Sequence, residues 1–361
     1  MIFERAAQRE FANTAAAVFV ALFAILISTV LIRLLGQAAG GRLPSDAVLA
    51  LIGFGALAQL PIVLSLTLFI AILTTLSRSY RDSEMVVWFA SGVPLTAWIR
   101  PVLKFSLPLV VVIAAATLVI APWAQLKSVE YRERSTSRDD ASRVAPGVFR
   151  ESARGERVFF VEIGAGDDGR VRNVFVSSMQ QGRLGVMVSA EGFLRTDEQG
   201  QRFVVLENGR RYEGTPGTAD YRVMEFERYA VRIQDRAAVE PPQKPRMLTL
   251  RELVEQPVPA NRGELLARIG TPVAALLLSL LAIPMSFVNP RAGRTNNLIA
   301  AILTYLVYTN AISIAQAWVT QGKISFALAL WIPHLLVLLL LGALFYKRLS
   351  LLSIWRRRTS S

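Results

Sequence analysis

The sequence predicts an α-helical membrane protein with six transmembrane helices and an all-β domain inserted between helices 3 and 4. Two observations indicate this fold class: six long segments that contain no Asp, Glu, Lys or Arg, and a polar central region in which apolar and polar residues alternate. An apolar segment of about 20 residues crosses a bilayer as a helix, and alternation with a period of two is typical of strands. The 361-residue chain is therefore expected to divide between lipid and water.

The six uncharged segments are arranged as three before the central region and three after it. They cover residues 11–32, 47–77, 105–126, 269–290, 295–322 and 324–346. Each is long enough to cross a hydrocarbon core of about 30 Å. Residues 1–126 are thus predicted to hold transmembrane helices 1–3, and residues 265–361 to hold helices 4–6 and a basic cytoplasmic tail.

The net charge of +13 lies beside the apolar segments, because basic and acidic residues nearly cancel between residues 127 and 264. The short loops on one side carry only Arg42 and Lys323. The basic residues that flank the alternate loops are Arg5, Arg9, Arg78, Arg81, Arg100, Lys104, Arg291, Arg294, Lys347, Arg348, Arg356, Arg357 and Arg358. Since cytoplasmic loops carry the excess of Lys and Arg, both termini are predicted to be cytoplasmic and the β domain periplasmic. The excess of positive charge is therefore explained by the orientation of the chain in the membrane. On this interpretation we exclude nucleic acid as a partner.

The first apolar segment is too long for the core of a signal peptide and is predicted to be a retained span. It ends at Arg33 on the outer side. This arginine has two interpretations: its guanidinium snorkels to ordinary headgroups, or it faces a cavity and holds an anionic lipid headgroup.

The stretch between residues 77 and 101 joins the second and third apolar segments and is predicted to contain a short cytoplasmic helix near residues 79–92. Ser79 and Asp82 have the spacing of a capping box, which marks a helix start. Gly92 followed by Pro94 is a typical helix stop.

One face of this short helix is predicted to be apolar, since Met85, Trp88 and Phe89 recur at helical spacing. Asp82 and Glu84 lie near its N-terminus, where the helix dipole favours negative charge. Two interpretations remain open: the helix is the contact for a separate cytoplasmic motor, or it is an ordinary amphipathic connector held against lipid.

The polar region over residues 127–247 is predicted to be one external all-β domain. Alternation typical of strands covers residues 171–178, 184–190, 202–207 and 221–233. Turn-forming residues separate these runs, namely Asp167, Asp168, Gly169, Gln199, Gly200, Asn208 and Gly209. Short strands in series indicate a sandwich or a roll.

Residues 248–264 are predicted to link the β domain to the fourth transmembrane helix. Three prolines between residues 241 and 245 stiffen the approach, and residues 249–256 have the pattern of a short helix. Glu264 and Arg268 are four residues apart at the start of the fourth span, which is the spacing of an ion pair on a helix surface.

Side chains for catalysis or metal binding are scarce in the sequence. The Gly322–Lys323 pair lacks the rest of a P-loop, the chain has no cysteine, and His334 is its one histidine. We therefore expect no catalytic residues, no metal site, no directly bound cofactor and no enzymatic activity, so that any transport work needs energy from a partner. His334 is either a satisfied polar group in a membrane helix or part of a proton relay.

Five stretches together resemble a known family in the same order along the chain. They are IFERAAQREF at the start, Arg33 followed by LLGQAAGGRLP, the loop SRSYRDSEMVVWFASGVP, GVFRE opening the β domain, and GELLARIGTPVAALLLSLLAIPMSFVNPRAGR around the fourth span. With the six spans, they resemble the permeases of lipopolysaccharide-export ABC transporters, the LptF/LptG family, and within it the LptF type. The resemblance covers nearly the whole length.

The resemblance implies that the β domain is a jellyroll and that the chain is a non-catalytic permease subunit. The implied partners are an LptG-type permease, an LptB-type ATPase dimer that uses the ATP, and an LptC-type bitopic protein that binds through the jellyroll. The implied substrate is lipopolysaccharide, which enters through lateral gates formed by spans 1 and 5 of the two permeases. The ATPase is implied to dock at Asp82, Ser83, Glu84 and Met85.

The implied function is to extract lipopolysaccharide from the outer leaflet of the bacterial inner membrane and to pass it to a periplasmic bridge toward the outer membrane. Arg33 matches a position where the family meets lipid A phosphates, whereas Val30, one turn earlier, replaces a second basic residue that relatives can carry. The alternative is a membrane-anchored periplasmic scaffold or adaptor without transport activity. A lipoprotein-release permease fits less well, because such permeases usually have four spans.

Overall fold

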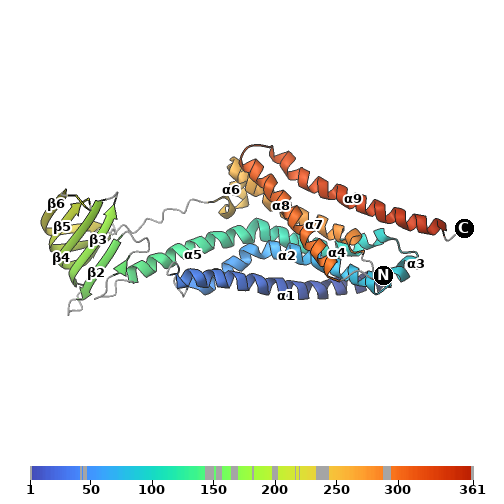
Figure 1. Cartoon of the computed structure of the whole chain (residues 1–361), viewed down its shortest axis with the longest axis horizontal. Helices are drawn as coiled ribbons and strands as arrows, with labels where there is room; N and C mark the ends of the chain where they lie inside the picture. The colour runs from blue at the N-terminus through green and yellow to red at the C-terminus, as the bar shows by residue number, and fades with distance from the viewer. Residues whose placement is uncertain are drawn as a thin grey trace. The chain divides into compact units, whose positions relative to one another are not determined.

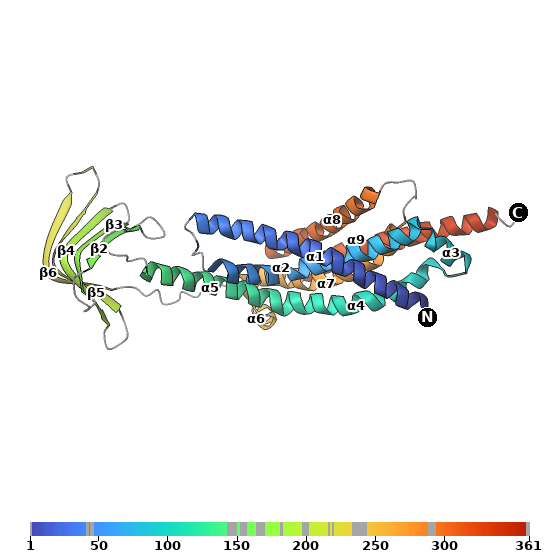
Figure 2. The same ribbon diagram turned by 90° about the horizontal axis from the view of Figure 1, so that it is seen from below.

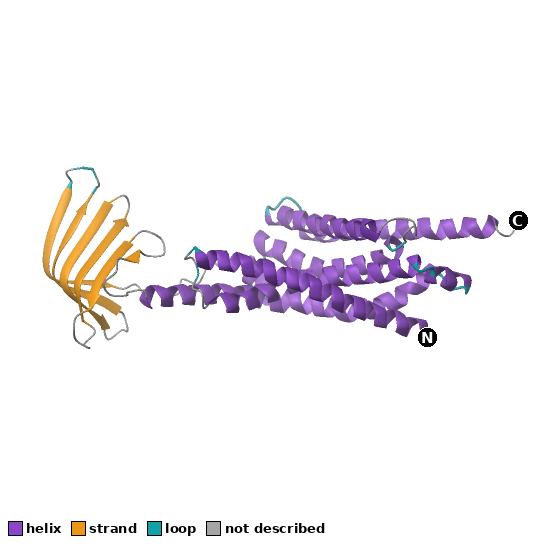
Figure 3. Ribbon diagram, turned by 60° about the horizontal axis from the view of Figure 1, so that its bottom comes forward, coloured by secondary structure: helices purple, strands orange, loops and turns teal. Residues whose placement is uncertain are grey.

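The computed structural model describes residues 2–40, 43, 47–142, 150–151, 157–163, 170–180, 183–196, 202–215, 217–218, 220–232, 244–287 and 294–358. The chain divides into two compact units. The membrane unit comprises Met1–Arg33, Ala50–Ser128 and Gln243–Ser361, and the β unit comprises Leu34–Leu49 and Val129–Pro242. Figure 1 labels α1–α9 and β2–β6, and Figure 3 distinguishes the helices from the strands.

Within the described residues, six helical spans are long and apolar enough to cross a membrane, as the sequence predicts. Five are single helices: α1 (Ile2–Ala39), α2 (Val48–Arg81), α7 (Pro259–Met285), α8 (Arg294–Thr320) and α9 (Phe326–Arg358). The third span joins η2 (Leu95–Trp98), α4 (Ile99–Ala115), a π-helical turn η3 (Ala116–Ile120) and α5 (Ala121–Ser142). This span places Arg100 and Lys104 within α4, and its last helix continues into the region expected to be β structure.

Helix α7 forms the centre of the membrane unit. It packs against α4, α8 and α9, and it buries small residues such as Ala274, Ala275 and Ser279. At Gly263 the neighbouring helix comes so near that an added Cβ would lie 3.0 Å from the backbone oxygen of Gln316 in α8. Small side chains therefore let α7 approach its neighbours closely, as is usual in membrane bundles.

The β unit contains one antiparallel sheet in which neighbouring strands follow one another along the chain. The strands are β1 (Arg150–Glu151), β2 (Arg157–Ile163), β3 (Arg170–Gln180), β4 (Arg183–Thr196), β5 (Arg202–Gly214) and β6 (Tyr221–Arg232). The all-β region that the resemblance implies as a jellyroll is, over the described residues, a single sheet that curves strongly (Figure 2). All four predicted strands are confirmed, and β2 was missed because its apolar residues are continuous rather than alternating.

Asparagines with a positive φ interrupt the ladder of the sheet without changing its register. Pairing between β5 and β6 passes from Glu207 with Arg228 to Gly209 with Phe226, so the register is the same on both sides of Asn208. Asn208 has a φ of 54°, and Asn173 in β3 has a φ of 49° at a similar interruption. Asparagine tolerates this left-handed conformation better than most residues. The register shifts between β2 and β3, at Phe160 and Glu162, where a bulge or irregularity bends the edge of the sheet.

The turn predicted at Asn208 and Gly209 is therefore wrong, since both residues lie inside β5. A positive φ at asparagine occurs in tight turns and also within strands, and pairing with strands on both sides decides the outcome here. The turns predicted at Asp167, Asp168 and Gly169 and at Gln199 and Gly200 lie outside the described residues.

Gly209 leads to a testable prediction for the β unit. An added Cβ would lie 2.6 Å from the backbone oxygen of Val188 in β4, so Gly209→Ala forces two strands apart. We expect a loss of about 1–3 kcal/mol in the free energy of unfolding, as for other overpacked sites. Gly185→Ala is the matched control, because its nearest neighbour is the rotatable Ser178 hydroxyl at 3.3 Å. Faster protease cleavage of the β unit should be seen only for the Gly209 variant; equal rates would contradict the prediction.

The link between the β unit and α7 is described from residue 244 onward. It consists of η4 (Pro245–Met247) and α6 (Leu250–Glu255). Helix α6 confirms the predicted short helix and begins with a capping box formed by Thr249 and Glu252. The backbone N–H of Thr249 donates to the Glu252 carboxylate at 2.6 Å, which lowers the pKa of that carboxyl. The prolines at 241 and 242 and the basic turn after residue 287 lie outside the described residues.

Candidate functional site

The short helix between the second and third spans is α3 (Glu84–Ala90), and it begins later than predicted. The expected capping box at Ser79 and Asp82 is wrong. Helix α2 continues to Arg81, and Ser79 lies within it with only 3% of its surface exposed. The backbone N–H of Asp82 donates to the Arg78 oxygen at 2.9 Å as part of that helix. A capping side chain binds N–H groups left unpaired at a helix start, and within a continuous helix those groups are already paired.

A tight corner separates α2 from α3. Ser83 adopts a left-handed conformation with a φ of 62°, and its side chain makes no cap hydrogen bond. A single left-handed residue reverses the chain direction at a cost of about 1–2 kcal/mol for a non-glycine side chain. Packing of α3 against the membrane unit offsets this strain.

The two faces of α3 have different environments. Met85 is 1% exposed and belongs to the core of the membrane unit, and Trp88 and Phe89 pack against the same core. Val86 and Val87 on the other side are 63% and 67% exposed. The predicted apolar face is therefore the one that anchors α3. Met85 fixes the helix in place, while Val86 and Val87 provide free apolar surface.

The negative charges at the start of α3 lie beside one arginine of α2. Arg78 Nη1 is 3.7 Å from an Asp82 oxygen and 3.8 Å from a Glu84 oxygen. Arg78 Nη2 donates to Glu10 of α1 at 2.6 Å. The side chains of all four residues are 40–46% exposed, so this cluster is accessible from solvent. Glu84 thus lies where a partner can reach it, at the N-terminus of α3.

Arg33 lies far along α1 from this cluster. Its side chain is exposed, and among the described residues no hydrogen bond or ion pair to its guanidinium is found. Val30 is 4% exposed and packs against α2, where an added Cβ on Gly55 would be 3.2 Å from a Val30 methyl group. A basic side chain at position 30 would need to leave this contact. Any phosphate contact in this part of α1 therefore depends on Arg33.

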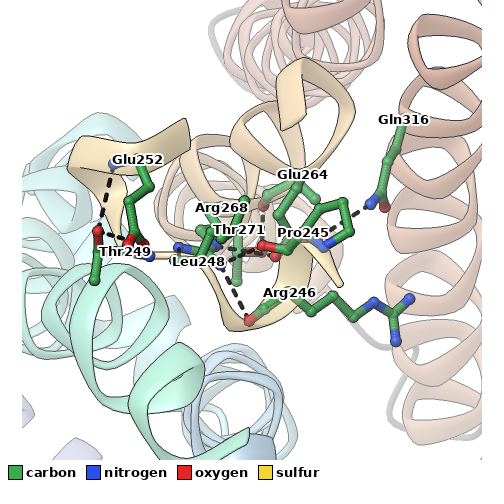
Figure 4. Close-up of polar contacts among 10 residues, drawn as sticks. Pro245, Arg246, Leu248, Thr249, Glu252, Glu264, Arg268, Thr271 and Gln316 are labelled. Carbon is green, nitrogen blue, oxygen red and sulfur yellow. Dashed lines mark hydrogen bonds and ion pairs between the residues drawn. The ribbon is translucent and has the colours of Figure 1, made fainter. Parts of the chain in front are cut away.

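A buried polar cluster connects α7 to the segment that precedes it (Figure 4). Arg268 Nε donates to Glu264 at 2.9 Å, which confirms the predicted ion pair. The same guanidinium donates to the backbone oxygens of Leu248 at 2.9 Å and of Pro245 and Arg246 at 3.1 Å each. Arg268 is 3% exposed, so its charge is shielded from solvent and is compensated by these four acceptors. The three carbonyl contacts were not predicted, because backbone acceptors leave no signature in side-chain spacing.

Comparison with known proteins identifies the family. The protein-family model described as "Lipopolysaccharide export system permease LptF/LptG" matches residues 5–347 of the chain. The chain belongs to the LptF/LptG family. It is 28% identical over 343 residues to the lipopolysaccharide export system permease protein LptF of Escherichia coli K12, covering 94% of this chain and 93% of the relative. The protein of the same name from Shigella flexneri matches with the same figures. The resemblance found in the sequence is confirmed, and the chain is a multi-pass lipopolysaccharide export permease.

In this LptF/LptG chain the predicted site residues occupy two separate places. Asp82, Ser83, Glu84 and Met85 lie together at the α2–α3 corner, whereas Arg33 is 23 residues beyond Glu10 on α1, a distance of about 35 Å along a helix axis. Arg78 and Glu10 were not predicted as members of the site. Arg78 is four residues before Asp82, and this helical spacing is the one signal that could have indicated it.

His334 of this LptF/LptG chain has a partner inside the bundle. Its Nδ1 atom lies 2.5 Å from the hydroxyl of Tyr308 in α8, and the two rings meet edge to face. An added Cβ on Gly270 of α7 would be 3.5 Å from His334 Nε2. This environment favours the interpretation of His334 as a satisfied polar group that joins α7, α8 and α9.

Proposed function

We propose that the chain is the non-catalytic membrane subunit of an ABC transporter, which extracts lipopolysaccharide from the outer leaflet of the inner membrane and passes it to a periplasmic bridge. A separate ATPase dimer of the LptB type drives it. The observation that supports this most directly is the arrangement of α3. Its core face is fixed by Met85, while the Glu84 carboxylate and the two exposed valines are presented on the outside.

An external energy source is required by the chemistry of the substrate. Moving a buried CH₂ group out of a bilayer costs about 0.8 kcal/mol, and lipid A carries several acyl chains. The sequence contains no P-loop, so the energy has to enter through another subunit. ATP binding would move α3, and packed helices transmit such a movement as a rigid body.

The other parts of the complex follow from family membership together with the topology of the chain. Both termini and α3 are cytoplasmic, and the β unit is periplasmic. A second permease of the LptG type completes the cavity, with spans 1 and 5 as lateral gates. An LptC-type protein binds the β unit and receives the lipid. ATP is bound by the ATPase subunit, and the permease itself uses no cofactor.

Affinity purification in mild detergent, followed by reconstitution, tests this proposal. We expect a P-loop ATPase and a second six-span protein to accompany the chain, and the reconstituted complex to release lipopolysaccharide to a periplasmic acceptor only when ATP is present. If the chain is instead a scaffold, it should bind a periplasmic protein through its β unit, with no ATPase attached and no release.

The proposed contact between Arg33 and a lipid A phosphate can be tested by changing the charge of this side chain. Arg33→Glu places a negative charge where the proposal requires contact with a lipid A phosphate, so photo-crosslinking of lipopolysaccharide to α1 should fall at least about fivefold, roughly 1 kcal/mol of binding. Arg33→Lys keeps the charge and should retain most of the crosslinking. If both variants crosslink like the wild type, Arg33 only snorkels to headgroups.

A further inference from the structure

We infer that the Arg78–Glu10 ion pair is the link through which movement of α3 reaches α1, so that both residues are positioning residues for transport. The inference rests on the proposed function, since it assumes that a motor moves α3. It adds a route within this chain from the ATPase contact to the helix that carries Arg33.

The guanidinium of Arg78 contacts two elements through two different nitrogen atoms. Nη2 donates to the Glu10 carboxylate at 2.6 Å, while Nη1 lies 3.7 Å from Asp82 and 3.8 Å from Glu84. A planar guanidinium fixes the directions of its donors, so both contacts exist at the same time. A shift of Asp82 and Glu84 relative to α2 therefore changes the electrostatic environment of the Arg78 guanidinium, which donates to Glu10.

The buried residues of α1 lie near its N-terminal end and again beside Arg33. Ala7 and Phe11 are buried near the N-terminal end, and Thr14 bonds with Thr75 of α2 at 3.1 Å. Between residues 12 and 29 no residue of α1 is buried within the described chain. The next buried position is Val30, beside Arg33. Because α1 is one continuous helix, a tilt at its N-terminal contacts moves the position of Val30 and Arg33 as well.

A second ion pair on the same helix provides a natural comparison. Lys104 of α4 donates at 2.9 Å to Glu4, which lies about 1.7 turns before Glu10 on α1. This pair anchors α1 to the bundle as well, but neither of its members contacts α3 in the structure described. If the ion pairs only anchor α1, removing either pair should impair transport. If the Arg78–Glu10 pair transmits the movement of α3, only its removal should do so.

The Arg78–Glu10 pair is expected to contribute little to folding, so its role in transport can be tested by mutation without unfolding the protein. The side chains are 40% and 44% exposed, and ion pairs of this exposure contribute little to folding because solvent screens them. Removing Glu10 should therefore leave the fold and the α3 surface intact. A large functional effect of such a change would be difficult to attribute to stability.

The experiment measures the number of lipopolysaccharide molecules released per ATP hydrolysed by the complete complex in nanodiscs. For Glu10→Gln we expect ATP hydrolysis within about twofold of the wild type and a release ratio at least about fivefold lower, a change of roughly 1 kcal/mol. Glu4→Gln should leave the ratio unchanged. Because the effect requires Arg78, Glu10→Gln should cause no further loss in an Arg78→Gln background.

Each other outcome overturns the inference. A wild-type ratio for Glu10→Gln means that the pair transmits nothing. An equal loss for Glu4→Gln indicates general anchoring of α1, and failure of Glu10→Gln alone to assemble indicates a folding contact. A wild-type complex that hydrolyses ATP without releasing lipid, or that contains no ATPase, contradicts the proposed function itself and is seen before any variant is measured.

Discussion

Replacing Arg268 with alanine should destabilise the protein more than any other single change at a polar residue described above, by about 3–5 kcal/mol. The substitution removes the positive partner of the buried Glu264 carboxylate, because Arg268 Nε donates to it at 2.9 Å, and leaves it the longer 3.5 Å contact from the Gln316 amide. It also removes the donor to the backbone oxygens of Pro245, Arg246 and Leu248. A buried acceptor that loses its donor costs about 1–3 kcal/mol.

The measurement is thermal unfolding of the purified protein in detergent, in which we expect the melting temperature to fall on the order of 10 °C. Arg251→Ala is a matched control, because Arg251 and Glu255 form an ion pair with the same four-residue spacing but are 85% and 57% exposed. Such a pair contributes about 0.3–0.5 kcal/mol. If the two alanine variants melt together, the Arg268 cluster is not a stabilising element.

A double variant separates the ion pair from the carbonyl contacts. Changing Arg268 to methionine and Glu264 to leucine removes both buried charges, and such replacements are often neutral or stabilising. The backbone oxygens of Leu248, Pro245 and Arg246 still lose their donor in this variant. Its melting temperature should therefore lie between those of the wild type and Arg268→Ala. Full recovery would show that the carbonyl contacts contribute nothing.

The parts of the fold that the sequence predicts well are those with a strong local pattern. Long uncharged segments identify all six spans, and the short helix predicted over residues 249–256 is found as α6, which begins with the Thr249–Glu252 capping box. The same kind of pattern fails at Ser79 and Asp82. There, α2 continues to Arg81, and the buried side chains of Leu76 and Ser79 belong to its packed face. Tertiary packing of the second span decides where this helix ends, and a four-residue motif does not contain that information.

The contacts of the candidate site could also be predicted from the sequence only in part. The spacing of Glu264 and Arg268 predicts their ion pair, yet the carbonyl oxygens that surround Arg268 become known only from the fold. Arg78 and Glu10 are separated by 68 residues, so no local pattern joins them. Contacts between distant segments and contacts to backbone atoms are the two classes that sequence spacing leaves undetermined.

Replacing Glu84 with alanine should detach the motor and so abolish lipopolysaccharide export. Glu84 lies at the N-terminus of α3 with 43% of its side chain exposed, next to the exposed Val86 and Val87. Once an ATPase covers this surface, the carboxylate becomes an interfacial charge. Truncating one member of such a charge pair costs about 2–5 kcal/mol, which corresponds to at least about thirtyfold weaker association.

Retention of the ATPase during affinity purification, together with ATP-dependent release of lipid, measures this effect. Glu10→Gln is the informative control, because Glu10 is also a carboxylate on Arg78 but lies on α1. If α3 is the docking surface and Arg78 the link beyond it, Glu84→Ala loses the ATPase, while Glu10→Gln keeps the ATPase and loses only the coupling. Periplasmic binding through the β unit should survive in both variants, since neither residue belongs to that unit. Export that persists in the Glu84 variant, with the ATPase still bound, would place the motor contact elsewhere on the chain.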